Sequence, residues 1–353
     1  MRRGASLRFA PAIMLVMLAS AFAMVHAGRE AADPLSIDSG LSDAAMVSDV
    51  LSHSSAGRPS QPVQPLEGPW VVAIQPGHWE VDQLPAEHAR RRGNIGASHL
   101  GVREVEVNVA VTRALVPLLE GEGWIVTVVP ATVPPGLRAD AFLSIHADWA
   151  ANPGRNGWKL AAPWRPSPAG QDLARALRGS FLAEPDLNED VNGITVGMRG
   201  YFGFAAHRFH HASSPFTPAV LVELGFLTND LERARFVERP EYYASILHRG
   251  LLDYFAARDR SETASLVPLE FGPMVARGGG AVVRRSADVA SGILRRLEPD
   301  ETVRPVDAVD GWYEVRIRTP ALTGWVRADD LIPFGARVRD ADPPRSHGVP
   351  DSR

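Results

Sequence analysis

Residues 71–79, VVAIQPGHW, constrain the fold more than any other stretch of the chain. Residues 71–74 form a short apolar, mostly β-branched run, and Gln-Pro-Gly ends it directly before His78. A run of this kind predicts a buried parallel strand that leads into a turn. Ligands of open α/β sheets bind beyond the carboxyl ends of such strands. We therefore expect His78 to lie at a site, although a turn histidine that bonds only its neighbours is the simpler alternative.

Apolar runs alternate with amphipathic segments through the middle of the chain. The expected strands are at 124–129, 141–145 and 219–226, and the expected helices are at 104–120, 171–181 and 240–255. Pro117 should kink or shorten the first of these helices. The alternation implies an α/β fold with a mostly parallel sheet, covered by helices on both faces.

The first 27 residues have the features of a secretory signal peptide. Three arginines precede an uncharged apolar run at residues 9–25, and Val-His-Ala then offers small residues to a signal peptidase. Since the run is short for a membrane span, we expect cleavage after Ala27 rather than an uncleaved anchor. The chain should therefore be exported to the cell envelope, periplasm or extracellular space, and should contact a membrane only if the leader is kept.

Composition divides the remaining chain into linkers and two domains. Residues 28–67 are rich in Ser, Asp, Ala, Gly and Pro, which predicts a disordered tether. An α/β domain at 68–258 and a linker at 259–276 follow. Residues 277–335 consist of short β-rich pieces separated by turn residues, at the spacing of a small all-β barrel. Residues 336–353 are a polar tail.

Composition also limits the chemistry. The chain has no cysteine, so any metal must be held by nitrogen and oxygen ligands. The formal charge of -4 gives no sign of nucleic-acid binding. Lys159 is the only lysine, which we interpret as a compositional bias without functional meaning.

Three side chains that can bind metals are expected at comparable places. His78 follows one strand, Glu104 begins a helix, and His146 follows another strand. Two imidazoles and a carboxylate form the three-ligand set of a catalytic zinc site with an open fourth position. The set is dispersed and lacks HExxH spacing, so spacing alone does not identify it. Glu104 could simply favour the positive end of its helix, and His146 could bond to the backbone.

Glu223 lies inside AVLVELGF, where the strand should be buried on both sides. An ionised carboxylate there is costly unless it meets a metal, a cation or a reacting proton. A structural ion pair with an arginine is one interpretation. A general base beside a zinc site is the other.

The segments VVAIQPGHW, GVREVEVNVA, AFLSIHADW and PAVLVELGFLTND together resemble the four signature segments of the zinc-dependent N-acetylmuramoyl-L-alanine amidases of bacterial cell-wall turnover. The resemblance covers residues 69–258. It implies that His78, Glu104 and His146 bind one Zn2+ ion and that Glu223 is the catalytic glutamate. It also implies a zinc amidase/exopeptidase-like fold, peptidoglycan as substrate, and hydrolysis of the amide between N-acetylmuramic acid and L-alanine.

Some positions depart from the family pattern and others match it. The family usually has Asp where Gln75 stands and Gly where Trp79 stands, whereas Asp148 falls where Asn or Asp occurs. Asn108 and Arg199 match family positions. Gln75 and Trp79 are expected to change the hydrogen bonding around the metal and the shape of the cleft.

The carboxyl-terminal domain resembles a bacterial SH3-like barrel. The resemblance rests on residues 283–286, 311–315 and 324–326, above all on their two Gly-Trp pairs. It implies a module that binds wall polymer and raises the local enzyme concentration. A structural appendage without a ligand is the alternative.

Other residues and functions stay open. His207, His210 and His211 form a second cluster, for which an exposed loop is favoured over a second metal site, with substrate contact as a further alternative. Trp158 and Trp164 could line a cleft or pack in the core. A wall-binding protein without turnover and a zinc peptidase that cuts the stem peptide are the alternative functions. The ligand set and Glu223 argue against the first, and product analysis would separate the second.

Overall fold

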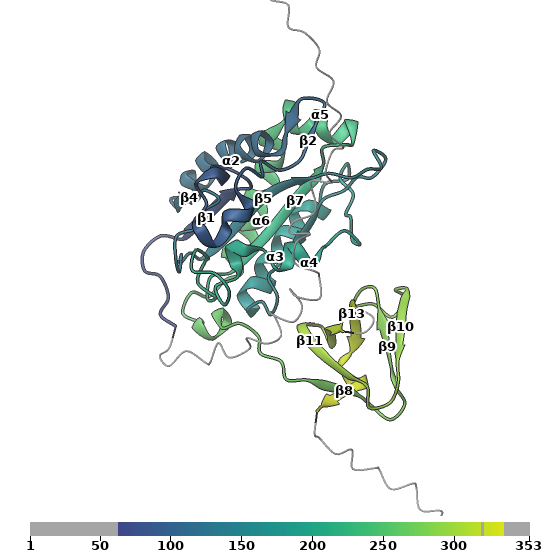
Figure 1. Cartoon of the computed structure of the whole chain (residues 1–353). Coiled ribbons are helices and arrows are strands. Elements are labelled where there is room, and N and C mark those ends of the chain that lie inside the picture. The colour runs from purple at the N-terminus through teal and green to yellow at the C-terminus, as the bar shows by residue number, and fades with distance from the viewer. Residues whose placement is uncertain (1–62, 319–320, 335–353) are drawn as a thin grey trace, which may run out of the picture. The chain divides into compact units, whose positions relative to one another are not determined.

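The computed structural model describes residues 63–318 and 321–334 (Figure 1). The expected signal peptide at 1–27, most of the tether and the polar tail at 336–353 lie outside the described residues. None of the described helices is long and apolar enough to span a bilayer.

A five-stranded sheet forms the centre of the α/β region, in the order β4-β1-β5-β7-β6. Its strands are β1 (Val71–Pro76), β4 (Ile125–Val128), β5 (Ala141–Asp148), β6 (Lys159–Ala161) and β7 (Ala219–Phe226). The first four in this order pair in parallel, and β6 pairs antiparallel with β7. This confirms the mostly parallel sheet. The edge strand β6 is too short for its sequence to have indicated it.

Three long helices pack on one face of this sheet. They are α2 (Glu104–Gly121), α3 (Pro168–Leu182) and α6 (Pro240–Ala257), with α6 packed against both of the others. Their apolar side chains form the main core with alternate strand residues such as Leu143 and Val222. The shorter α5 (Asp230–Glu238) follows β7.

The other face is covered by short helical segments and loops. Met198 of α4 (Val196–Arg199), Tyr201, and Phe204 of η3 (Phe202–Phe204) pack against strand residues that include Phe142 and Leu221. These strand residues alternate with those of the main core, as the period of two requires. Helices therefore lie on both faces, but this face is thin.

Between β1 and α2 the chain forms no long element. The 3-10 helices η1 (Val81–Gln83) and η2 (Ala86–Arg91) are followed by a hairpin of β2 (Ser98–His99) and β3 (Val102–Arg103). The hairpin leads directly into α2.

Pro117 does not shorten α2, which continues to Gly121. Both Pro117 and Arg113, whose carbonyl would have accepted the missing N–H, are on the exposed side of the helix. Water can satisfy that carbonyl, so the lost hydrogen bond costs less than it would in a core.

Residues 274–333 form a separate antiparallel sheet in the order β10-β9-β13-β12-β11-β8-β14. The strands are β8 (Met274–Ala276), β9 (Ala281–Arg284), β10 (Ile293–Leu297), β11 (Thr302–Val309), β12 (Trp312–Ile317), β13 (Leu322–Arg327) and β14 (Leu331–Pro333), with η4 (Thr263–Leu266) before them and η5 (Ala328–Asp330) before β14. Apolar residues such as Val283, Val315 and Val326 form its core. The all-β architecture agrees with the sequence pattern.

Candidate metal centre

His78 stands in the turn that follows β1. Its φ angle of 64° lies in the left-handed region, which costs a non-glycine residue on the order of 1 kcal/mol and is concentrated at functional sites. Its Nδ1 lies 2.7 Å from the carbonyl oxygen of Asn94. Because a carbonyl only accepts hydrogen bonds, Nδ1 carries the proton and Nε2 keeps its lone pair. That Nε2 lies 3.3 Å from Oε1 of Glu104.

Glu104 is the first residue of α2 and is buried. Its Oε2 accepts a hydrogen bond from the backbone N–H of Ala97 at 2.7 Å. Its Oε1 lies 2.9 Å from Nδ1 of His146, on β5. Figure 1 shows β1, which leads into His78, side by side with α2 and β5, which carry Glu104 and His146.

The three side chains converge on one point. His78, Glu104 and His146 each offer one ligand atom, and these atoms lie within 4.8 Å of one another. The imidazole rings are 5.1 Å apart between centroids and stand nearly perpendicular, at 80°. Two imidazole nitrogens and a carboxylate oxygen suit a divalent metal with an open coordination position. Among the residues that the structure describes, this is the group with metal-binding geometry.

Two glycines allow this close approach. A Cβ on Gly77 would lie 2.4 to 2.6 Å from three atoms of the His146 ring. Gly96, with a φ angle of 82°, would place a Cβ 2.3 Å from Oε2 of Glu104. No side chain fits at either position. Asn108 of α2 donates to the carbonyl of Gly77 at 3.1 Å and so holds the turn against the helix.

The protonation of the cluster follows from burial and proximity. Burial lowers the pKa of His146, although Glu104 opposes this, so the neutral ring that a metal needs is favoured. Burial alone would raise the pKa of Glu104, but the charges and hydrogen bonds of His78 and His146 reverse this and hold it well below its ordinary value. Glu104 is therefore ionised, and a buried anion requires a cation nearby.

Glu223 lies at the centre of β7, next to the candidate metal ligand His146. The strand register pairs it with His146 of β5 on one side and with Lys159 of β6 on the other. Its Oε2 is buried and has no hydrogen-bond partner among the described residues. Burial raises its pKa well above the ordinary value, and the charges of Asp148 and Glu104 raise it further. The residue beside Glu223 on β6 is a lysine, whereas the structural alternative had named an arginine as its ion-pair partner.

Lys159 is the residue that sequence reasoning missed. Its side chain is 3% exposed and forms an ion pair with Asp148, and its ammonium lies 3.6 Å from Asp190. The ammonium also lies 4.7 Å from the ring centroid of Phe226. A single lysine inside the apolar stretch GWKLAA already indicates a buried charge that must be paired, and this signal is independent of the compositional bias.

The second histidine cluster belongs to a loop whose residues His210 and His211 contact Glu87 of η2. The carboxylate of Glu87 accepts hydrogen bonds from the backbone N–H groups of His210 and His211, at 3.0 and 2.8 Å. The same carboxylate lies 2.7 Å from Nδ1 of His211. Trp158, a candidate cleft residue, is 1% exposed and packs against Phe181 in the main core.

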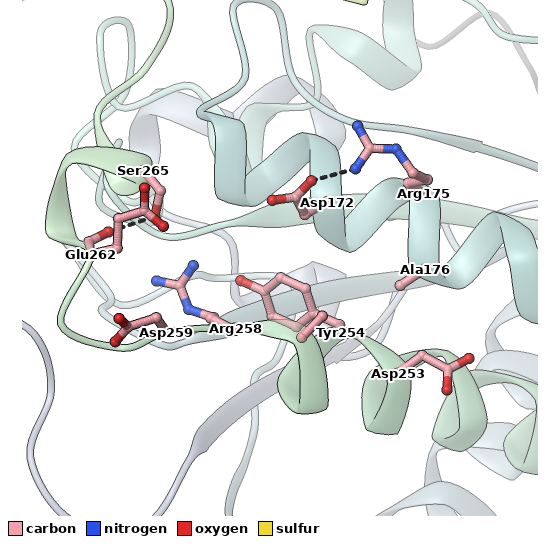
Figure 2. Close-up of a pocket in the computed structure, with 10 residues that line it drawn as sticks. Asp172, Arg175, Ala176, Asp253, Tyr254, Arg258, Asp259, Glu262 and Ser265 are labelled. Atoms are coloured by element: carbon pink, nitrogen blue, oxygen red, sulfur yellow. Dashed lines mark hydrogen bonds and ion pairs between the residues drawn. The ribbon is translucent and has the colours of Figure 1, made fainter.

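A cavity of about 300 Å³ lies between α3, the end of α6 and η4 (Figure 2). Charged side chains of both signs line it, among them Asp172, Arg175 and Asp253. Tyr254 of its wall donates a hydrogen bond to the carbonyl of Asp140, the residue before β5. Asp140 and His146 are about 20 Å apart along an extended strand. The cavity therefore lies at the opposite end of the sheet from the metal cluster.

Residues 72–249, about half of the chain, match a family model described as N-acetylmuramoyl-L-alanine amidase. No curated protein matches the chain in sequence. The solved structures that it resembles include the N-acetylmuramoyl-L-alanine amidase AmiC2 of Nostoc punctiforme, at 22% identity and a TM-score of 0.39, covering 54% of this chain and 99% of that one. Another is the N-acetylmuramyl-L-alanine amidase Ami1 from Mycobacterium smegmatis, at 20% identity and a TM-score of 0.38, covering 55% and 100%. A third is the catalytic domain of the amidase CwlV from Bacillus (Paenibacillus) polymyxa var. colistinus, at 22% identity and a TM-score of 0.35, covering 54% and 99%.

Proposed function

The chain belongs to the N-acetylmuramoyl-L-alanine amidase family, and from this premise we propose that His78, Glu104 and His146 hold one zinc ion and that Glu223 is the general base. The reaction is hydrolysis of the amide between N-acetylmuramic acid and L-alanine in peptidoglycan. The chain is thus a hydrolase that acts on a carbon–nitrogen amide bond.

The convergence of two imidazoles and one buried carboxylate, with ligand atoms within 4.8 Å of one another, supports the choice of zinc. Zinc accepts nitrogen and oxygen ligands in a four-coordinate site that keeps one position for substrate or water. When bound, the ion would polarise the scissile carbonyl and lower the pKa of water at the site.

Glu223 moves the proton in this proposal. Its carboxylate takes a proton from the attacking water and returns it to the leaving amine nitrogen of L-alanine, so it ends each turnover ionised. Burial keeps its pKa raised, which lets it hold the proton between the two transfers. A cation bound at the neighbouring cluster would lower that pKa and so favour the ionised base at the start of the cycle.

The remaining assignments extend the proposal to the whole chain. Residues 1–27 are a signal peptide and residues 28–67 a tether, so the enzyme is exported and acts in the cell envelope or outside the cell. Residues 68–258 are the catalytic domain, 259–276 a linker and 277–335 an SH3-like domain that binds wall polymer. The antiparallel sheet at residues 274–333 is compatible with that last assignment.

The test is digestion of peptidoglycan by the full-length protein, with and without a chelator. Mass spectrometry should find new free L-alanine amino termini that vanish with chelator and return with added zinc. New ends inside the stem peptide would identify a zinc peptidase instead. No release from protein that holds zinc and binds the wall would identify a binding module.

Two variants test the individual roles. Glu223→Gln should keep zinc and lose turnover, because an amide cannot take the proton. His146→Ala should lose both. Metal-dependent hydrolysis that persists in Glu223→Gln would exclude Glu223 as the base.

A further inference from the structure

A line of buried polar side chains lies behind His146 on the thin face of the sheet. Ser144 precedes His146 by two residues on β5, so both point to the same face. Gln75 of β1 pairs with Ser144 in the strand register, and the hydroxyl of Tyr201 donates a hydrogen bond to Gln75. Gln75 and Ser144 are fully buried, at 0% exposure. Each polar atom in this line must therefore find its partner inside the protein.

The backbone decides the orientation of the Gln75 amide. Its Nε2 lies 2.8 Å from the carbonyl oxygen of Pro130 and 3.4 Å from that of Ala131. A carbonyl oxygen only accepts hydrogen bonds, so the NH₂ group, and not the amide oxygen, must face these two. Oε1 therefore faces the other way. It lies 3.0 Å from Oγ of Ser144 and 2.7 Å from the hydroxyl oxygen of Tyr201.

The proton of Ser144 is then assigned as well. Oε1 of Gln75 only accepts, so Ser144 donates its one hydroxyl proton to it. Oγ of Ser144 also lies 3.1 Å from Nε2 of His146. Having given its proton to Gln75, Oγ can only accept there, so Nε2 of His146 carries the ring proton. Nδ1 then keeps its lone pair and faces Oε1 of Glu104, a second acceptor, across 2.9 Å, so these two atoms need a cation between them.

We propose that Gln75 is a positioning residue for the metal centre. Acting through Ser144, it selects the tautomer and ring orientation in which His146 binds the metal through Nδ1. This inference rests on the proposed metal site. His78 binds through the opposite nitrogen, Nε2, because Asn94 engages its Nδ1. Each histidine thus presents the nitrogen that its own hydrogen-bond partner leaves unprotonated.

Zinc affinity of the full-length protein, measured by competition with a chromogenic chelator, tests the proposal. Gln75→Leu frees the hydroxyl proton of Ser144 to turn toward Nε2, which favours protonation of Nδ1, the ligand atom. Ser144→Ala removes the acceptor of the Nε2 proton. Each variant should weaken zinc binding about 10- to 100-fold, the range found for partners of metal-binding histidines.

A double variant separates positioning from general damage. If Gln75 acts through Ser144, Gln75→Leu should have little further effect in the Ser144→Ala background. Tyr201→Phe is the matched control, because it removes the hydroxyl that bonds Gln75 and Ser144 but leaves Oε1 of Gln75 and Oγ of Ser144 in place. Its zinc affinity should stay within about threefold of the wild type, below the range for direct partners. Equal losses from Gln75→Leu in both backgrounds, or no loss in either, would overturn the proposal.

Nitrogen-15 NMR of the zinc-loaded wild type, labelled at histidine, gives a second readout that needs no variant. His146 should show zinc on Nδ1 and a proton on Nε2, whereas His78 should show the reverse. Zinc on Nε2 of His146 would overturn the inference even if Gln75→Leu failed to fold. A wild type that holds no zinc would instead overturn the metal site itself.

Discussion

Two buried groups of charge lie beside Glu223, and they are neutralised in different ways. In one, the carboxylates of Asp148 and Asp190 share the ammonium of Lys159. In the other, the ionisable side chains that face Glu104 are His78 and His146, whose nitrogens lie 3.3 and 2.9 Å from it. The chain supplies the cation in the first group. In the second group it supplies only ligands.

This difference separates a structural ion pair from a site. A buried ion pair is complete when the protein folds, and solution conditions change it little. A buried carboxylate that faces two imidazoles is incomplete, because the facing lone pairs repel unless a proton or a metal lies between them. The two groups should therefore respond in opposite ways to mutation and to added zinc.

The largest expected effect is at the first group. Lys159→Met should lower the free energy of unfolding by about 3–5 kcal/mol, because it leaves buried carboxylate charge without a cation. The double variant Lys159→Met with Asp148→Asn should recover much of that loss. Urea unfolding in the presence of a chelator measures both. A loss under about 1 kcal/mol is typical of exposed ion pairs, and it would contradict the assignment of the Lys159 ion pairs as a buried, stabilising group.

Added zinc should stabilise the protein only through the second group. Zinc at 100 times its Kd should raise the free energy of unfolding of the wild type by about 2.7 kcal/mol. Glu104→Gln should show little of this gain, since it removes the anionic ligand. Lys159→Met, if it folds, should keep the gain. Thermal unfolding with and without zinc checks this, and equal gains in wild type and Glu104→Gln would contradict it.

Gly77→Ala should disturb the second group, around Glu104, and leave the ion pairs of Lys159 intact. The new Cβ would lie about 2.4 to 2.6 Å from the His146 ring and displace it. We expect zinc affinity to fall about 10- to 100-fold, or about 1.4–2.7 kcal/mol. Gly121→Ala, at the end of α2, is the matched control because a Cβ there meets nothing within 4 Å. Chelator competition should find its affinity unchanged.

Glu87 is a third carboxylate, more exposed than either buried group, and should show the smallest effect. Partial burial would raise its pKa, but hydrogen bonds from His211 and His210 outweigh this and lower the pKa to about 2. The folded pKa is below the ordinary value, so the stabilisation is present above about pH 4.5 and is lost as the pH falls toward 2. Because its side chain is 27% exposed, solvent screening limits the loss in Glu87→Gln at pH 7 to about 1 kcal/mol.

The free energy of unfolding, measured between pH 2 and pH 7, tests whether the stabilisation from Glu87 is lost as the pH falls. Wild type and Glu87→Gln should converge in stability as the pH falls. A difference that grows with acidity would mean that Glu87 is held protonated in the folded protein, as a buried carboxylate without donors would be.

The amino-acid pattern alone predicts a large part of this fold. Continuous apolar runs such as 219–226 indicate central parallel strands, and the spacing of Val107, Val111 and Leu115 indicates a buried helix face. His78 and Glu104 stand where such strands and helices end or begin. These signals are local, because burial and period two or 3.6 are properties of neighbouring residues.

Hydrogen-bond partners and pairing of charges were decided only by the tertiary structure. Ser144 and Gln75 are 69 residues apart in sequence, and Glu87 and His211 are 124 apart. A polar residue inside an apolar run predicts that a hydrogen-bond or ion-pair partner exists, but the sequence does not identify that partner. In the tautomer proposed for His146, the nitrogen left free for a metal depends on where Pro130 turns its carbonyl. The sequence thus determined the strands, the helices and the residue types of the candidate site. Packing of distant segments determined which hydrogen bonds form and which atoms carry their protons, because each bond requires a partner that only the folded chain brings near.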